Sequence, residues 1–115
     1  MSRLIHLKTK DVVAESVLKA RNLWERTRGL LGRTHFPEKE AFWISHCSSI
    51  HTFFMKFPID VIFVDKELKV TSLAHSVPSF RILLGGWKSK AVFEMKAGEL
   101  KKHNIQKGDK LYVGY

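Results

Sequence analysis

The chain is poor in the features that mark several protein classes. It has a single cysteine among 115 residues, so it cannot form an internal disulfide and does not resemble a disulfide-stapled secreted domain. Its N-terminus lacks a long apolar stretch with a cleavage-site pattern, and no apolar run approaches the ~20 residues that a membrane helix needs. These absences favour a cytoplasmic protein with no membrane partner.

Internal repeats, low-complexity segments and linkers are also missing from the sequence, so residues 1–115 are predicted to form a single domain. Apolar residues make up 44% of the chain and charged residues 27%, as in ordinary globular proteins. A chain of this size buries roughly two thirds of its unfolded surface. We therefore expect a real hydrophobic core and no extended disorder.

Positive charge is in excess, and it is unevenly distributed. The net charge is +9; residues 1–40 hold 9 Lys and Arg against 5 Asp and Glu, residues 41–80 hold 3 against 3, and residues 81–115 hold 8 against 3. A basic surface attracts nucleic acid, phosphorylated ligands or acidic proteins, although it can also serve solubility alone. The basic excess flanks the middle of the chain.

The pattern of apolar residues predicts a mainly β fold, at the margin of α+β. We expect a compact β-sandwich or barrel-like domain of about seven short strands with one or two short helices. One helix should begin at Asn22, where Glu25 completes a capping-box pattern. Residues 76–90 read as a long irregular segment. The strands are predicted at residues 4–7, 12–20, 41–45, 50–55, 59–64, 69–75, 91–95 and 110–113, with a second short helix at 99–104.

Four blocks of the sequence resemble a known family, the domain of unknown function 192 (uncharacterised protein family 0127). They are RGLLGR at 28–33, IHTFFM at 50–55 followed by PIDVIFVD at 58–65, VFEMKAG at 92–98, and IQKGD at 105–109. The resemblance implies a compact, mainly β fold with a short helix, and it does not by itself indicate any catalytic activity. Cys47, His51 and Thr52 depart from the sequence that many members of the family have there.

Cys47, His51 and Asp60 are the candidates for catalysis. A thiol beside an imidazole that a carboxylate orients is the arrangement of a cysteine nucleophile. Each residue also has a structural interpretation: a buried thiol, a histidine satisfied by a backbone carbonyl, and an aspartate that accepts backbone N–H groups. With His46 they could supply metal ligands, but the spacing fits no standard zinc site and disfavours a closed structural one, while an open three-ligand site is the alternative. No metal and no cofactor is predicted.

Glu94 lies inside an apolar strand pattern and therefore faces solvent or a cationic partner. Arg28 and Arg33 could pair with it through two parallel hydrogen bonds each. This arrangement is either a structural salt bridge or part of a polar pocket, together with His51 and Asp60, that binds an anionic ligand.

Trp87, Lys88 and Lys90 follow Gly85-Gly86 and form the best candidate for a basic binding loop. Lysines attract phosphate, and a tryptophan can stack on a base. The loop lacks the spacing of a nucleotide-binding fingerprint.

These sequence features are compatible with three functions. The first is a binding module with a polar pocket for a small anionic ligand. The alternatives are a basic surface that binds nucleic acid or an acidic protein, and a hydrolase or transferase based on cysteine and histidine. The sequence itself implies no oligomeric state.

Overall fold

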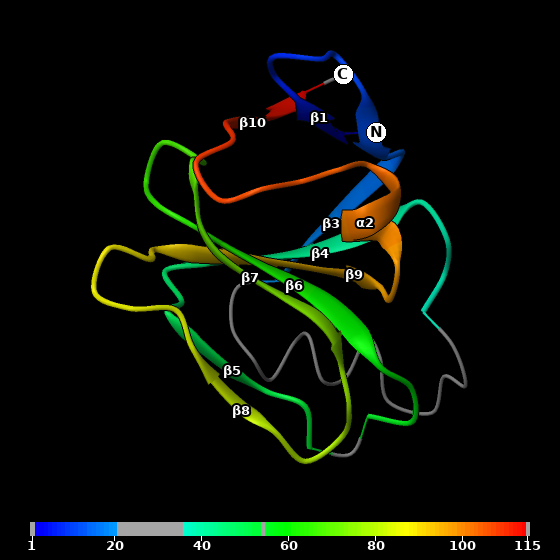
Figure 1. Ribbon diagram of the computed structural model, residues 1–115, viewed down its shortest axis with the longest axis vertical. Helices are drawn as coiled ribbons and strands as arrows, with labels where there is room; N and C mark the ends of the chain where they lie inside the picture. The colour runs from blue at the N-terminus through cyan, green and yellow to red at the C-terminus, as the bar shows by residue number, and fades with distance from the viewer. Residues whose placement is uncertain (1, 21–35, 54, 115) are drawn as a thin grey trace.

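A computed structural model gives the structure of the chain, and it describes residues 2–20, 36–53 and 55–114. In this part of the chain ten β-strands form three sheets, and there is one short helix (Figure 1). No described helix is long and apolar enough to cross a membrane. The mainly β class is confirmed, as packed open sheets and not as a closed barrel.

The largest sheet has five strands, and its centre is the most buried part of the molecule. Every residue of β6 (Ile59–Val64) is buried, as its near-continuous apolar sequence predicted. β6 pairs with two antiparallel neighbours, β9 and β7, while β3 and β4 form a parallel pair at the other end. The strand order is β3 (Ser16–Ala20), β4 (Glu40–Ser45), β9 (Ala91–Lys96), β6 and β7 (Val70–Val77).

Alternate residues of this sheet enter two separate apolar clusters, one on each face. On β6, Ile62 and Val64 belong to the first cluster, and Val61 and Phe63 belong to the second. Successive side chains of a strand point to opposite faces, so both faces must be covered.

Two smaller sheets supply that cover. A three-stranded sheet in the order β10 (Leu111–Gly114), β1 (Arg3–His6) and β2 (Val12–Ala14) contributes to the first cluster, together with α2 (Glu99–Lys102). A two-stranded ribbon of β5 (Ser49–His51) and β8 (Ile82–Leu84) contributes Ile50 and Leu83 to the second. In Figure 1 the ribbon and α2 lie on opposite sides of the large sheet.

Short strands explain why the predicted number of about seven is too low. The strand predicted over 12–20 is divided at Glu15, because the N–H groups of Glu15 and Ser16 both bind the carbonyl of Lys39. The strand predicted over 50–55 ends at His51, and β8 lies inside the predicted irregular segment. The helix predicted from Asn22 lies outside the described residues.

Candidate functional site

A lysine-rich pocket of about 450 Å³ lies where three connections of the main chain meet. These are the turn between β6 and β7, the loop between β8 and β9, and the turn before β10. The pocket is lined by residues 65, 69–71, 85–88 and 107–108 and is called the lysine pocket below. Its volume lies within the range of small-ligand sites.

The charge of the lysine pocket is mainly positive. Lys69, Lys88 and Lys107 line it against one carboxylate, Asp65. The Asp65 Oδ1 atom accepts hydrogen bonds from the backbone N–H groups of Glu67 at 2.8 Å and Lys69 at 3.0 Å. Part of the acceptor capacity of Asp65 is therefore used to shape its own turn. An adjoining hollow adds Lys66 and Lys90 and one further carboxylate, Glu67.

The wall formed by the loop after β8 is held in place by hydrogen bonds and close packing. Ser89 Oγ lies 2.8 Å from Thr71 Oγ1 and donates to the carbonyl of Gly85 at 2.5 Å. A Cβ atom on Gly85 would lie 2.3 Å from the Phe63 ring, so only glycine fits there. Gly86 has a φ of +89°, which glycine adopts without strain. This half of the pocket is therefore preformed.

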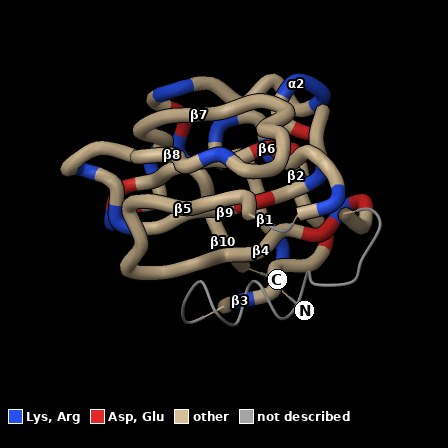
Figure 2. The backbone as a smooth tube through the Cα atoms, turned by 90° about the horizontal axis from the view of Figure 1, so that it is seen from below, with Lys and Arg blue, Asp and Glu red and all other residues tan. Residues whose placement is uncertain are grey.

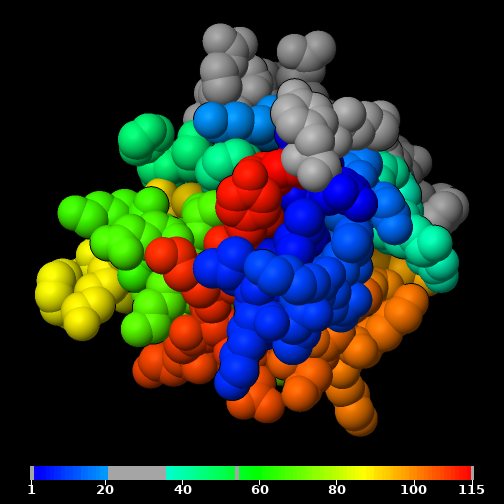
Figure 3. Space-filling view, turned by 90° about the horizontal axis from the view of Figure 1, so that it is seen from above, coloured from blue at the N-terminus to red at the C-terminus, as the bar shows by residue number. Residues whose placement is uncertain are grey.

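Trp87 stands at the rim with most of its ring in solvent. Its side chain is 83% exposed, and Lys88 Nζ lies 5.2 Å from the centre of the ring. A space-filling view shows the yellow segment just after residue 80 projecting from the body of the molecule (Figure 3). A ligand in the pocket can thus meet an aromatic face and an ammonium group together.

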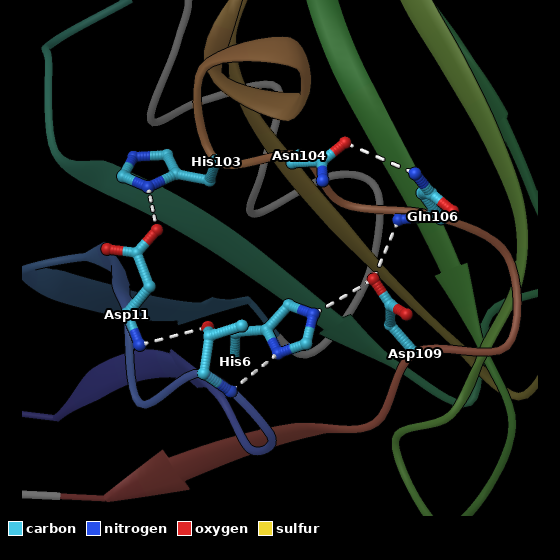
Figure 4. A network of polar contacts seen from close by, with 7 residues as sticks. His6, Asp11, His103, Asn104, Gln106 and Asp109 are labelled. Carbon is cyan, nitrogen blue, oxygen red and sulfur yellow. Dashed lines mark hydrogen bonds and ion pairs between the residues drawn. The ribbon is translucent and has the colours of Figure 1, made fainter.

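The opposite wall belongs to a turn that a polar network holds in place (Figure 4). Asp109 Oδ2 accepts a hydrogen bond from the N–H of Gln106 at 2.8 Å and lies 2.9 Å from His6 Nε2. The N–H of Gly108 donates to the carbonyl of Val70 at 2.9 Å. These contacts fix the backbone that carries Lys107. No group of three or more His, Cys, Asp or Glu among the described side chains is arranged to hold a metal ion.

Asp60, a predicted site residue, is fully buried and is bonded to the backbone. Its Oδ1 atom accepts the N–H of Ser76 at 2.8 Å, and its Oδ2 atom accepts those of Gly98 at 2.9 Å and Leu100 at 3.0 Å. Asp60 therefore joins β6 to the end of β7 and to the first turn of α2. With no solvent exposure, the carboxylate does not face a ligand-accessible surface in this structure.

Glu94, another predicted site residue, lies on the other face of the sheet from Asp60. Across the β6–β9 pair, Glu94 is opposite Val61 of the second cluster, and Asp60 is opposite Met95 of the first. Directly opposite residues share a face. The structure therefore does not bring the two carboxylates into one pocket. Arg28 and Arg33, the predicted partners of Glu94, lie outside the described residues.

His51 and Cys47 make separate local hydrogen bonds. His51 Nδ1 accepts the N–H of Phe53 at 3.3 Å, and the two rings stack with centres 5.0 Å apart. Cys47 Sγ donates to the carbonyl of Ser49 at 2.8 Å. Within the described part of the chain, no hydrogen bond joins Cys47, His51 and Asp60 into a thiol–imidazole–carboxylate chain. A catalytic role for them stays a prediction.

The basic loop predicted from the sequence contributes part of the lining of the lysine pocket. Trp87 and Lys88 were predicted as a basic loop and line it, and Lys90 lines the adjoining hollow. Lys69 and Lys107 were missed because they lie far apart in the sequence. The only signal was that each belongs to a turn: Lys69 follows Asp65 by four positions, and Lys107 directly precedes Gly108.

Comparisons with known proteins place the chain in a family. The model of domain of unknown function 192, described as uncharacterized ACR, matches residues 5–113. The chain belongs to this family. The search of curated proteins finds no significant match to this chain.

Two solved structures share its fold. One is a "putative transcription regulator" from Sinorhizobium meliloti 1021, with a TM-score of 0.80 and 18% identity over 97% of this chain and 91% of that one. The other is a protein of unknown function from Novosphingobium aromaticivorans DSM 12444, with a TM-score of 0.76 and 20% identity over 96% and 82% of the two chains. At these identities the likeness shows the fold alone.

Proposed function

We propose that this domain is a binding module for a small anionic ligand and that the ligand occupies the lysine pocket. The observation that carries the proposal is the convergence of Lys69, Lys88 and Lys107 with the exposed ring of Trp87 around one preformed hollow. The proposal keeps the ligand class predicted from the sequence. It moves the site away from His51, Asp60 and Glu94.

The chemistry of the lining indicates the kind of ligand. Ammonium groups bind phosphate and carboxylate as point charges, without a fixed planar geometry. The glycines of the loop leave room for close approach, and the indole offers a flat apolar face. A ligand with an anionic group and an aromatic or apolar part, such as a nucleotide, satisfies both halves of the pocket.

Calorimetric titration with AMP, adenosine and inorganic phosphate tests the proposal. AMP should bind more tightly than either probe alone, because only AMP contacts both the lysines and the indole. The Lys69→Gln/Lys107→Gln variant should weaken AMP binding about tenfold, at up to ~1 kcal/mol for each exposed charge. Trp87→Ala should cost about 1–3 kcal/mol if the ring stacks on the base.

A matched control separates the pocket from the general charge of the protein. Lys101→Gln/Lys102→Gln removes the same charge from α2, where both side chains are exposed and neither lines the pocket. If both pairs of substitutions weaken binding equally, the ligand responds to diffuse charge and the proposed site fails. Absence of binding for all three probes would refute the function as well.

Single-stranded nucleic acid is the second candidate ligand class. It is favoured by the exposed Trp87 beside Lys88, since base stacking on aromatic rings is common in such binding. However, Lys and Arg lie on several sides of the molecule with Asp and Glu between them (Figure 2). If single-stranded nucleic acid is the ligand, fluorescence anisotropy of a labelled oligothymidine should show an affinity that falls steeply with salt and is lost in Trp87→Ala. Affinity independent of salt excludes this candidate.

A further inference from the structure

A concentration of exposed apolar side chains lies on and beside the ribbon of β5 and β8, and of these only Trp87 also lines the lysine pocket. Six large apolar side chains are exposed in the described part of the chain, and four of them lie between residues 80 and 87. Phe80 is 67% exposed, Ile82 66% and Leu84 79%, with Trp87 beyond them. Contiguous exposed apolar surface of this kind marks interaction sites in proteins.

Strand register places these side chains on one outward face. Ile50 and Leu83 are opposite each other and pack into the second apolar cluster. His51 is opposite Ile82, so both point away from that cluster. Phe53 continues the surface, because its ring stacks on that of His51 at 5.0 Å and lies 6.1 Å from that of Phe80. We call this surface the ribbon face.

The end of the ribbon is held firmly, so the exposed side chains do not come from a poorly packed segment. Thr52 is fully buried, and its Oγ1 atom donates to the carbonyl of Pro78 at 2.6 Å and accepts the N–H of Arg81 at 2.9 Å. The N–H of Thr52 donates to the carbonyl of Arg81, and the N–H of Phe80 donates to that of Thr52. This clamp holds Phe80 and Arg81 against the end of β5.

The charge of the two ribbon segments is of one sign. Residues 46–57 and 78–90 contain four Lys and Arg and no Asp or Glu. In a chain of net charge +9, this pattern opposes the stacking of two copies face to face. The complementary partner must be both anionic and able to take up protruding apolar side chains.

We propose that the ribbon face docks the protein onto an anionic lipid bilayer. Phe80, Ile82 and Leu84 would enter the boundary between headgroups and acyl chains, while the flanking cations meet lipid phosphates. Trp87 with Lys88 beside it suits the headgroup level, where indole rings concentrate. A bilayer deforms around projecting side chains, so no matching groove is needed. The sequence alone had predicted no membrane partner.

Vesicle co-sedimentation at about 0.1 M salt tests the proposal directly. The full chain should bind phosphatidylcholine vesicles containing phosphatidylglycerol at least tenfold more tightly than phosphatidylcholine alone. Arg81→Gln should weaken that binding about fivefold, and the matched control Lys101→Gln should leave it unchanged. Equal binding to both vesicle types, or none to either, would overturn the proposal.

The apolar part of the face needs its own variant and control. Ile82→Ser/Leu84→Ser should weaken vesicle binding more than tenfold, whereas Tyr112→Ser, an exposed aromatic on β10, should not. Neither Ile82 nor Leu84 lines the lysine pocket, so this variant should retain any AMP binding. Vesicle binding that survives the double substitution would overturn docking through the ribbon face. So would a wild-type dimer in solution that the substitution converts to a monomer.

A second readout does not depend on whether the double variant folds. With Trp24→Phe and Trp43→Phe, Trp87 is the only tryptophan and reports its own surroundings. Its emission should shift to shorter wavelength on anionic vesicles and be quenched by lipids with brominated acyl chains. Unchanged emission with bound vesicles would place the contact elsewhere and overturn the proposal.

Discussion

Replacing Asp60 should strongly destabilise the domain. Its two oxygens accept three backbone N–H groups, from Ser76, Gly98 and Leu100, at a site with no solvent exposure. The bond from Leu100 is buried and those from Ser76 and Gly98 are part-buried, and a buried donor left without a partner costs about 1–3 kcal/mol. Asp60→Ala should therefore lower the free energy of unfolding by roughly 3–5 kcal/mol after relaxation, out of the ~5–15 kcal/mol typical of a domain.

Asp60→Asn gives a finer version of the same test. The amide keeps one oxygen as an acceptor but turns an NH₂ group toward the remaining donors, so at least one of the two hydrogen-bonding sides is lost. We expect a loss of about 2–4 kcal/mol. The matched control is Asp65→Asn, because Asp65 also accepts backbone N–H groups but does so in an exposed turn.

Urea unfolding at pH 7, followed by circular dichroism, measures both variants. Asp65→Asn should cost less than ~1 kcal/mol, since water can replace the lost acceptor. A loss below ~1 kcal/mol for Asp60→Ala would refute the structural role assigned to this carboxylate. It would also reopen Asp60 as a site residue.

Three further predictions concern other parts of the fold. Gly85→Ala should lower the free energy of unfolding by about 1–3 kcal/mol, because the new Cβ would clash with the Phe63 ring; an unchanged urea midpoint would contradict this packing. Thr52→Val should cost about 1–3 kcal/mol by leaving the N–H of Arg81 without its side-chain acceptor, and a loss confined to a few tenths would contradict the clamp. The hydrogen bond and the charge of Lys96, 2.8 Å away, lower the pKa of the Glu38 carboxyl, so the stabilising effect of this carboxylate is present above the ordinary pKa of 4.5 and is lost as the pH falls through the lowered pKa. The difference in Tm between the wild type and Glu38→Gln should therefore shrink over that pH interval. A difference that persists at pH 2 would contradict this ion pair.

The fold was predictable where side-chain pattern and burial agree. Ile59–Val64 reads as a doubly covered strand because nearly every residue is apolar, and the structure buries all six. Ile82–Leu84 could not be recognised, since three residues between a proline and two glycines carry no periodicity. Its strand character comes from pairing with β5, a contact distant in the sequence.

The candidate site was likewise predictable where its residues cluster in the sequence, and not where they meet only in the folded chain. The basic loop at Trp87 and Lys88 was visible as a local cluster, and a backbone-binding role for Asp60 was one of the two interpretations of that residue. The common pocket for Asp60 and Glu94 failed on strand register, because a shift of one position reverses the face on which a side chain lies. The positions of Lys69 and Lys107 depend on how the turns meet, which only the folded chain specifies.

Ligand binding in the lysine pocket can be tested residue by residue with ¹H–¹⁵N correlation spectra recorded during a titration with AMP. We expect saturable shifts at Gly85, Gly86, Gly108 and the Trp87 indole, with little change at His51 or Ser76. Shifts centred on His51 and Ser76, or shifts that never saturate at any resonance, would contradict the assignment of the lysine pocket as the binding site.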